Sequence, residues 1–280
     1  MSVNTFKIFL TTILLTLAFS GLTQQKDTSK VKKHNFYLFW GYNRSAYTKS
    51  DITMKADNYN YTLHNVVAHD RPSPFETKVY LNPAKLSIPQ FNIRAGYQLN
   101  EKWWISGGYD HMKYVVDAYQ NTTISGTIDS SASKLYAGTY DNTPLVLDDR
   151  DFLHFEHTDG LNFITIDAEY TSTLWQSKNT NFSFEHIAGG GAGFLYPRTD
   201  VTIFGIKNAN IFNLAGMGVS LKSQLRVNLW NIVFIQAAGK VGGITMPRIT
   251  TSGFNKDYAK QSFLFGEFYW VLGCKFGFGK

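Results

Sequence analysis

Carboxylates and imidazoles gather in one short stretch of this 280-residue sequence, between positions 148 and 160. The stretch reads DDRDFLHFEHTDG, and its side chains with ligating or catalytic chemistry are Asp148, Asp149, Asp151, His154, His157 and Asp159. Carboxylate oxygens suit Ca²⁺ and imidazole nitrogens suit Zn²⁺, so one interpretation is a divalent-cation site. The spacing matches no established metal-binding loop.

The same stretch also permits a hydrolase at the external rim of a membrane protein. His157 would act as the general base, and Asp159 would orient its imidazole. No serine stands at a position that marks it as the nucleophile. We favour a third interpretation, a solvated acidic loop that interacts with divalent cations at the surface.

Three other features have simpler explanations than catalysis. His69 and Asp70 could form a catalytic pair, but prolines at 72 and 74 fix extended backbone and favour a rigid loop tip. The glycine-rich run 188–193 is followed by no helix pattern, so it indicates a bend or a close approach of the wall. The single cysteine, Cys274, excludes an internal disulfide and a multi-cysteine metal site.

The N-terminus indicates the compartment. A lysine at position 7 precedes an apolar run over 8–19, and small or polar residues follow it. This order predicts a signal peptide over 1–23, because about 12 apolar residues are too few to cross a bilayer. Residues 24–33 are polar and predict a short periplasmic lead-in, which leaves residues 34–280 as the folded region.

The composition is unusual for a soluble domain. Aromatic residues reach 16% and charged residues only 17%, and the mean hydropathy is −0.20. A β-barrel averages to such a value because its strands alternate between lipid-facing and lumen-facing side chains. The net charge of +6 is scattered and lies in no arginine-rich run, so we expect no nucleic acid partner, and no cofactor motif is present.

Strict alternation of apolar and polar residues marks long strands. In the segment 88–99, for example, Phe91, Ile93 and Ala95 alternate with Asn92 and Arg94. Segments of this kind predict eight strands, at 34–47, 88–99, 103–116, 160–172, 182–203, 211–227, 232–246 and 262–278. The first strand is aromatic on both faces, so its orientation stays open.

The connections support this count. Tight polar turns near 100, 178 and 229 belong on the periplasmic side, which makes 48–87 and 117–159 long external loops. The strand-like content of 58–67 predicts a hairpin above the membrane. We therefore predict an all-β fold, a single antiparallel up-and-down transmembrane barrel of eight strands, with ten as the alternative.

The polar faces of these strands predict the contents of the lumen. They carry five cationic and four anionic side chains: Arg94, Lys222, Arg226, Lys240 and Lys275, with Asp167, Glu169, Glu185 and Glu267. Unpaired charge is costly in a narrow interior, so we expect a paired network that plugs the barrel. Aromatic girdles are expected from Trp40, Trp103, Trp104, Tyr170, Trp175 and Trp230.

The alternating strands, the tight turns and the Phe276/Phe278 ending resemble the small OmpA/OmpX-type outer-membrane barrels. The segments 88–97 and 155–162 look like those of uncharacterised barrels of this class. Lys280 departs from the usual aromatic terminal residue. The resemblance implies a Gram-negative outer-membrane location and biogenesis through the barrel-assembly machinery.

The sequence therefore predicts a non-enzymatic outer-membrane barrel. Its expected partners are outer-membrane lipid and lipopolysaccharide, and its long loops would bind an unidentified extracellular ligand or stabilise the membrane. The first alternative is an enzyme acting on lipid A or peptide through His157, and the second is a narrow channel or small-solute transporter.

Overall fold

The computed structural model describes residues 34–74, 76–80, 89–254 and 256–278. The predicted signal peptide and the periplasmic lead-in lie outside these residues. No helix in the described part of the chain has the length and apolarity to cross a bilayer.

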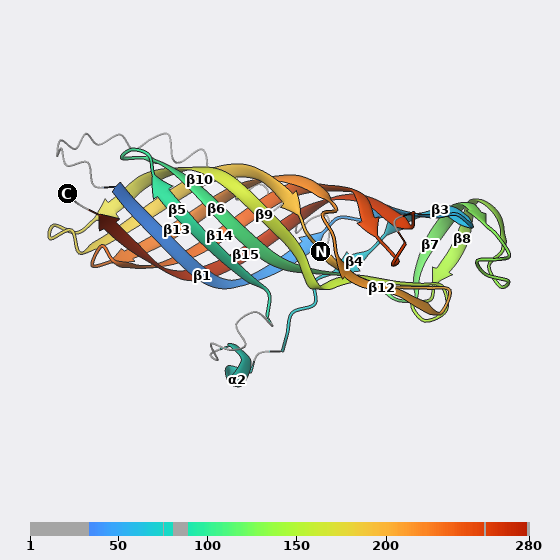
Figure 1. The fold of residues 1–280 in the computed structure, drawn as a ribbon. Coiled ribbons are helices and arrows are strands. Elements are labelled where there is room, and N and C mark those ends of the chain that lie inside the picture. Colours follow the sequence, from blue (N-terminus) through green and yellow to red (C-terminus); the bar gives the residue numbers. More distant parts are fainter. Residues whose placement is uncertain (1–33, 75, 81–88, 255, 279–280) are drawn as a thin grey trace.

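Eight antiparallel strands form a closed ring, as the alternation and the turns predict (Figure 1). Each strand pairs with its neighbour in the ring, and the first pairs with the last. The ring consists of β1 (His34–Tyr47), β5 (Phe91–Gln98), β6 (Trp103–Val116), β9 (Leu153–Gln176), β10 (Phe182–Leu195), β13 (Gly216–Leu229), β14 (Val233–Thr250) and β15 (Tyr258–Phe278).

The strands are tilted, and the register gives the stagger. From Ala46 the register partners run through Gly266, Val241, Leu221, Gly190, Ala168, Ile105 and Tyr97, and return to β1 at Phe36. Following the paired residues once around the barrel therefore leads back to β1 at a position ten residues before the start, which is the shear of the barrel. Eight strands with this shear leave an interior that side chains fill.

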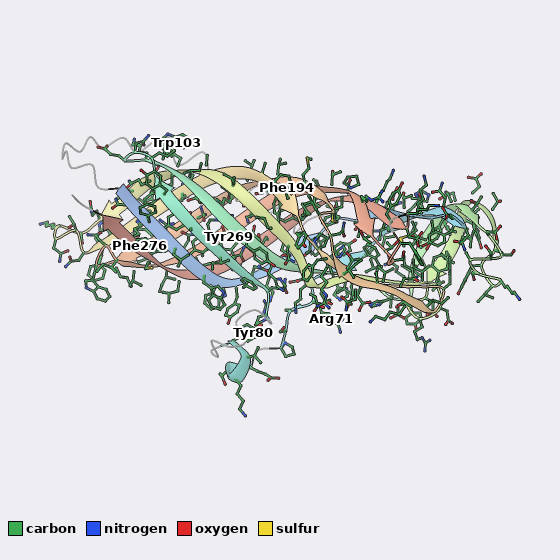
Figure 2. All side chains as sticks on the ribbon, in the orientation of Figure 1. Arg71, Tyr80, Trp103, Phe194, Tyr269 and Phe276 are labelled. Carbon is green, nitrogen blue, oxygen red and sulfur yellow. The ribbon has the colours of Figure 1, made fainter. Side chains whose placement is uncertain are left out.

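The outer wall carries a belt of exposed apolar side chains. Ile166, Met217 and Trp270 are 67%, 64% and 53% exposed. So much apolar surface would be unfavourable in contact with water. Trp103 and Phe276 lie toward the tight-turn end of the belt, and Phe194 lies toward the other (Figure 2). The chain is therefore a transmembrane β-barrel.

Seven further strands extend the barrel beyond this belt, at the long-loop end (Figure 1). We call them the distal strands: β2 (Ser50–Ala56), β3 (Tyr59–Val66), β4 (Ala68–His69), β7 (Gln120–Ile128), β8 (Gly138–Leu147), β11 (Arg198–Ile203) and β12 (Ile206–Phe212). The first loop does contain a hairpin, but it consists of β2 and β3, and the predicted segment 58–67 is only its second strand. A one-turn helix, α2 (Thr77–Tyr80), follows β4.

Several predicted boundaries are wrong, including the strand start at 211, because residues 211 and 212 belong to β12 and β13 begins at Gly216. The second loop, 117–159, is largely strand, because it contains β7, β8 and the first residues of β9. The predicted strand 182–203 is two strands, β10 and β11, which meet around Pro197, a residue without an N–H for the ladder. β9, β14 and β15 are longer than predicted because their outer ends pair with each other or with distal strands.

The inward face changes character along each long strand. In β9 the inward residues Thr165, Asp167 and Glu169 are polar, whereas Phe155 and Phe163 further out are apolar. The outward face changes in the opposite sense, from the apolar Ile164 and Ile166 to polar side chains at 154, 156 and 158. The barrel thus encloses a polar lumen within the belt and an apolar core beyond it.

The apolar core is large and joins the distal strands to the ring. Its fully buried members include Ile52, Met54, Leu63, Met112, Tyr114, Leu147, Phe152, Leu161, Leu195, Val201, Met246 and Phe265. Burial of aliphatic and aromatic side chains contributes about 1.5–3 kcal/mol each, so the distal strands fold onto the barrel as one body.

Candidate functional site

The nine charged residues predicted for the lumen all lie on its inner side, and most are fully buried. Arg94, Asp167, Glu169, Lys222, Arg226, Lys240 and Glu267 are at most 2% exposed, and Glu185 and Lys275 are half-buried. A tenth charge, Asp110 on β6, is 1% exposed beside them. It brings the described lumen to five cations and five carboxylates.

The sequence pattern did not predict Asp110 as a lumen residue, because apolar and polar residues do not alternate regularly in its strand. Inward Asp110 is followed by outward His111, so two polar residues stand side by side in the sequence. His111 is buried as well, and its Nδ1 lies 2.8 Å from Asn162 Oδ1. The inward position of Arg94, whose register partner is Gly108, is the signal that could have fixed the face of β6.

The middle of the lumen holds a four-charge cluster. Lys222 Nζ lies 2.6 Å from Asp167 Oδ2 and 2.6 Å from Glu169 Oε1, and Arg94 Nη1 lies 2.9 Å from Asp167 Oδ2. Tyr37 donates its hydroxyl to Glu169, with O–O distances of 2.8 and 2.9 Å to the two oxygens. Two cations and two carboxylates therefore cancel within hydrogen-bonding distance, as a buried charge requires.

The group nearest the apolar core is a triad with a different balance. Lys240 Nζ lies 2.5 Å from Asp110 Oδ2 and 3.2 Å from Glu267 Oε2. Asn92 donates its amide to both carboxylates, at 2.6 and 2.8 Å. Two carboxylates thus share one lysine here.

The group nearest the tight-turn end has the opposite balance. Lys275 Nζ lies 3.1 Å from Glu185, and Arg226 Nη1 lies 3.9 Å from the same carboxylate. Arg226 also lies over the ring of Phe234, at 4.2 Å. The excess positive charge here matches the excess negative charge of the Lys240 triad, so neutrality holds only for the lumen as a whole.

The glycine-rich run makes room for this network. A Cβ on Gly191 would stand 2.2 Å from Asp167 Oδ1, and one on Gly189 would stand 3.2 Å from both Glu169 and Lys222. The run is therefore a place where the wall passes close to other side chains.

One expected girdle residue is placed differently. Trp104 is 5% exposed and points into the lumen, where its ring lies 5.4 Å from that of Tyr37. Its neighbour Trp103 faces outward instead, 5.2 Å from Tyr170. Because alternate residues face opposite sides of a strand, the pair Trp103-Trp104 cannot both join a girdle.

The residues of the predicted rim site do not converge. Asp148 accepts hydrogen bonds from the backbone N–H groups of Arg150 and Asp151, so it caps its own turn. Asp149 is half-buried and Asp151 is exposed. Among the described residues, no three His, Cys, Asp or Glu side chains are placed to hold a metal ion.

His157 and Asp159 point to opposite sides of β9. His157 is fully buried, with Nδ1 3.1 Å from Thr199 Oγ1 and its ring against Tyr114 and Phe155. Asp159 is exposed and pairs with Arg198 at 3.0 Å. A register shift against β6 and a left-handed Gly160 (φ 125°) separate them, so Asp159 does not orient His157.

His154 contacts Glu156 on the outer surface instead. His154 Nε2 lies 3.5 Å from Glu156 Oε2, and Arg71 Nη1 lies 3.1 Å from the same oxygen. Burial alone would raise the pKa of Glu156, but hydrogen bonds from His154 and Thr158 outweigh it and lower that pKa to about 2. The hydrogen bond to Glu156 raises the pKa of His154. The three groups tie the loop after β4 to β9.

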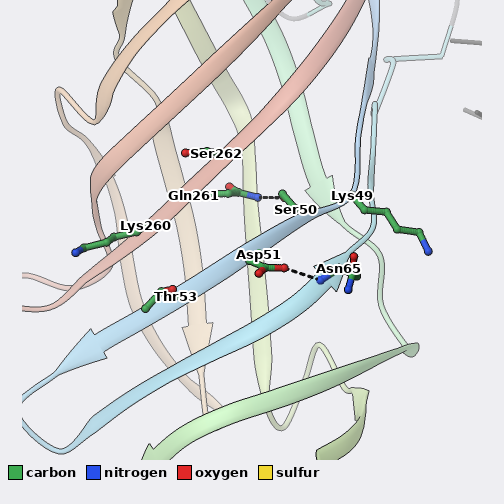
Figure 3. A pocket seen from close by; sticks show the side chains of 8 residues that line it. All are labelled: Lys49, Ser50, Asp51, Thr53, Asn65, Lys260, Gln261 and Ser262. Carbon is green, nitrogen blue, oxygen red and sulfur yellow. Dashed lines mark hydrogen bonds between the residues drawn. The ribbon is translucent and has the colours of Figure 1, made fainter. Parts of the chain in front are cut away.

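Two surface pockets lie among the distal strands. One, of about 450 Å³, lies where β2 meets β15, and Gln261 there donates to Ser50 at 2.9 Å (Figure 3). Asp51 accepts from the backbone of Asn65 at 2.8 Å, so the polar groups of this pocket mainly join strands to one another.

The other pocket, of about 580 Å³, lies where several distal loops meet, and we call it the tip pocket. It is lined by residues of the β2–β3 turn (Ala56, Asp57, Asn58, Tyr59), the β7–β8 loop (Ser131, Ala132), the β11–β12 hairpin (Ile203, Phe204, Ile206, Asn208) and the β14–β15 loop (Phe254, Lys256, Asp257). Phe254 and Ile206 are 74% and 63% exposed.

No protein-family profile and no curated protein matches the sequence. Among solved structures, the outer membrane protein OprG from Pseudomonas aeruginosa is similar over 89% of this chain and 99% of its own, with 11% identity and a TM-score of 0.42. The outer membrane protease OmpT from Escherichia coli is similar over 91% of this chain and 100% of its own, with 8% identity and a TM-score of 0.38. Neisserial surface protein A is similar over 86% of this chain and 97% of its own, with 11% identity and a TM-score of 0.35. These similarities are too low to transfer a function.

Proposed function

We propose that this chain is a non-enzymatic outer-membrane protein, a sealed barrel that presents its distal strands at the cell surface as an interaction platform. The closed ring and its apolar belt support a membrane location, and the signal-like N-terminus supports export to the outer membrane. The tight turns then face the periplasm, and the distal strands face the exterior.

The observation that carries this proposal is the filled interior. Salt bridges and hydrogen bonds join the charged groups of the lumen, and the apolar core stands directly above them. An ion would have to break buried pairs and then cross an apolar layer, which is unfavourable at both steps.

Planar-bilayer recording tests the seal. We expect the purified protein, inserted in a planar bilayer, to give no conductance steps above the bare membrane. Regular single-channel steps that follow insertion would instead favour the narrow-channel alternative.

The tip pocket is the surface through which we expect contact with an extracellular partner. Exposed apolar groups that line one pocket are typical of a contact site, and both Phe254 and Ile206 line the tip pocket. Glycan and protein arrays can be probed with the wild type and with the double variant Phe254→Ser/Ile206→Ser. Leu135→Ser is the matched control, since Leu135 is 77% exposed but does not line the pocket.

We expect the double variant to lose the array signal and the control to keep it. Equal binding by the double variant would remove the tip pocket from the proposal. Absence of any wild-type signal would leave membrane stabilisation as the function.

The enzyme alternative is tested separately. The inward position of His157 gives it no access to a lipid or peptide at the rim. Lipid A mass spectra from cells with and without the gene, and peptide cleavage by the purified protein, should show no difference from controls. A lost acyl chain or a cleaved peptide would replace the non-enzymatic proposal.

A further inference from the structure

The first external loop does not stay above the barrel. After β4 the chain turns back, and α2 lies beside the outer wall instead of over the mouth (Figure 1). Tyr80, at the end of α2, is only 5% exposed because it lies against Tyr42 of β1, with ring centroids 4.7 Å apart. The Tyr42 hydroxyl donates to the Tyr80 carbonyl at 2.5 Å, and the Tyr80 hydroxyl donates to the Ser73 carbonyl at 2.8 Å.

The wall that receives α2 belongs to the apolar belt. Tyr42 follows Leu38 and Trp40 on the outward face of β1, and Leu38 is 43% exposed. The Tyr42 ring lies 4.5 Å from that of Trp40 and 5.6 Å from that of Trp270. Because Trp270 is an exposed member of the belt, the Tyr42–Tyr80 contact lies at the edge of the surface that lipid covers. Figure 2 shows Tyr80 between α2 and the wall.

Arg44 marks the height of this contact in the membrane. It is the next outward residue of β1 after Tyr42, and it is exposed. A guanidinium on the lipid-facing side is expected at the headgroup layer, because it is costly in the hydrocarbon. The boundary between acyl chains and headgroups therefore lies near Tyr42 and Arg44.

The guanidinium is held in place, and the nearby Asp70 carboxylate interacts with its charge without forming a salt bridge with it. Arg44 Nη1 donates to the Asn43 carbonyl at 2.7 Å, and Nη2 donates to the Tyr80 hydroxyl at 3.4 Å. In the described part of the chain, no carboxylate oxygen lies within 4.0 Å of it. The planar fork of an arginine matches a phosphate, which outer-leaflet lipids supply at this height.

The backbone of α2 excludes a deeper position. One turn of helix satisfies few of its own N–H and C=O groups; here Val79 and Tyr80 both donate to the Glu76 carbonyl at 2.9 Å. The remaining groups need water or headgroup oxygens, since hydrocarbon offers no partner. An aromatic residue with a polar tip, such as Tyr80, is typical of this interface.

We propose that α2 and Arg44 form a lipid-headgroup site in the outer leaflet. The Tyr80–Tyr42 contact holds α2 in the headgroup layer beside β1, and Arg44 binds the phosphate of an adjacent lipid. This inference rests on the proposed membrane placement and is independent of what the tip pocket binds.

Spin labelling tests the depth of α2. Cys274→Ser removes the single cysteine, and Thr77→Cys then places a nitroxide on α2. Ile166→Cys in the belt and Leu135→Cys in the exposed β7–β8 loop supply the lipid and water references. In lipid vesicles, oxygen should relax the Thr77 label more than a water-soluble nickel chelate does, with a ratio between the two references. A ratio equal to that of the Leu135 label would overturn the placement, provided that heat-modifiable gel migration shows a folded barrel.

Lipid titration tests the phosphate. The Thr77-labelled protein in maltoside micelles is titrated with phosphatidylglycerol or with a phosphate-free glycosyl diacylglycerol. We expect saturable immobilisation with phosphatidylglycerol alone, and roughly tenfold weaker binding in Arg44→Gln. Lys134→Gln, an exposed distal charge, should leave the titration unchanged. Equal responses to the two lipids, or an unchanged titration in Arg44→Gln, would refute the phosphate site.

Discussion

Lys240 is the residue whose loss the barrel should tolerate least. Its amine is the only one of the described cations within 4.0 Å of Asp110 and Glu267, and its side chain is fully buried. Lys240→Met would leave two carboxylates that already share the amide of Asn92. Two like charges about 4 Å apart repel by about 4 kcal/mol at an effective dielectric of 20. Breaking a buried pair costs about 3–5 kcal/mol by the same reasoning.

The charge balance of the triad predicts that replacing Glu267 destabilises the barrel less than replacing Lys240. Glu267→Gln leaves a neutral Lys240–Asp110 pair and an amide that still has hydrogen-bonding capacity. We therefore expect it to cost less than about 1 kcal/mol. The triple variant Lys240→Met/Asp110→Asn/Glu267→Gln removes the whole charge set and should recover most of the stability lost in Lys240→Met.

Urea unfolding in lipid vesicles measures these differences. Tryptophan fluorescence follows the transition, and cold gel migration reports the folded fraction independently. Equal losses for Lys240→Met and Glu267→Gln would refute the charge count. A Lys240→Met variant within about 1 kcal/mol of the wild type would refute the claim that the triad is held by this lysine.

Three further predictions concern other contacts. Gly108→Ala should destabilise the barrel by about 1–3 kcal/mol, since its Cβ would stand 2.4 Å from Arg94 Cζ, whereas Gly107→Ala, with no atom within 4 Å, should be neutral in the same urea assay. Burial lowers the pKa of His157, beyond the belt, to about 3, so the folded state binds fewer protons than the unfolded chain below about pH 6.5. Stability should therefore fall as the pH drops from 6.5 toward 3, by up to about 4–5 kcal/mol, and His157→Asn should flatten that slope in acid-unfolding curves. Tyr37→Phe removes the hydroxyl that donates a hydrogen bond to Glu169, so the free energy of unfolding should fall by about 1.5–3 kcal/mol. A urea midpoint equal to that of the wild type would contradict this.

Most of the fold could be predicted from the alternation of apolar and polar residues along the strands. Where one face meets lipid and the other meets a polar lumen, the pattern is strong, and 34–47 and 103–116 match β1 and β6 residue for residue. The nine lumen charges follow from the same pattern. β1 is the informative exception, because Tyr37 and Phe39 line the lumen while Leu38 faces outward, and both faces are apolar by residue type.

The strand boundaries and side-chain orientations at the rim could not be predicted from this alternation. Beyond the belt the inward face becomes apolar, so β9 no longer fits the membrane pattern above Phe163, and its first residues resemble a loop. A backbone irregularity at Gly160 then decides which of His157 and Asp159 points inward. Such irregularities depend on pairing with β6, about 45 residues away, and have no local signature.

The ring is closed by the strands at the two ends of the described chain. Residues 34–47 of β1 find their partners at 265–278 of β15, so the closing contacts join segments more than 200 residues apart. Loop-closure entropy makes such pairings slow to form. Until β15 is available, β1 has an exposed edge that could pair with a wrong strand or another chain. The seam between β1 and β15 is therefore the last part of the wall that can form and the place where a folding catalyst would have the most effect.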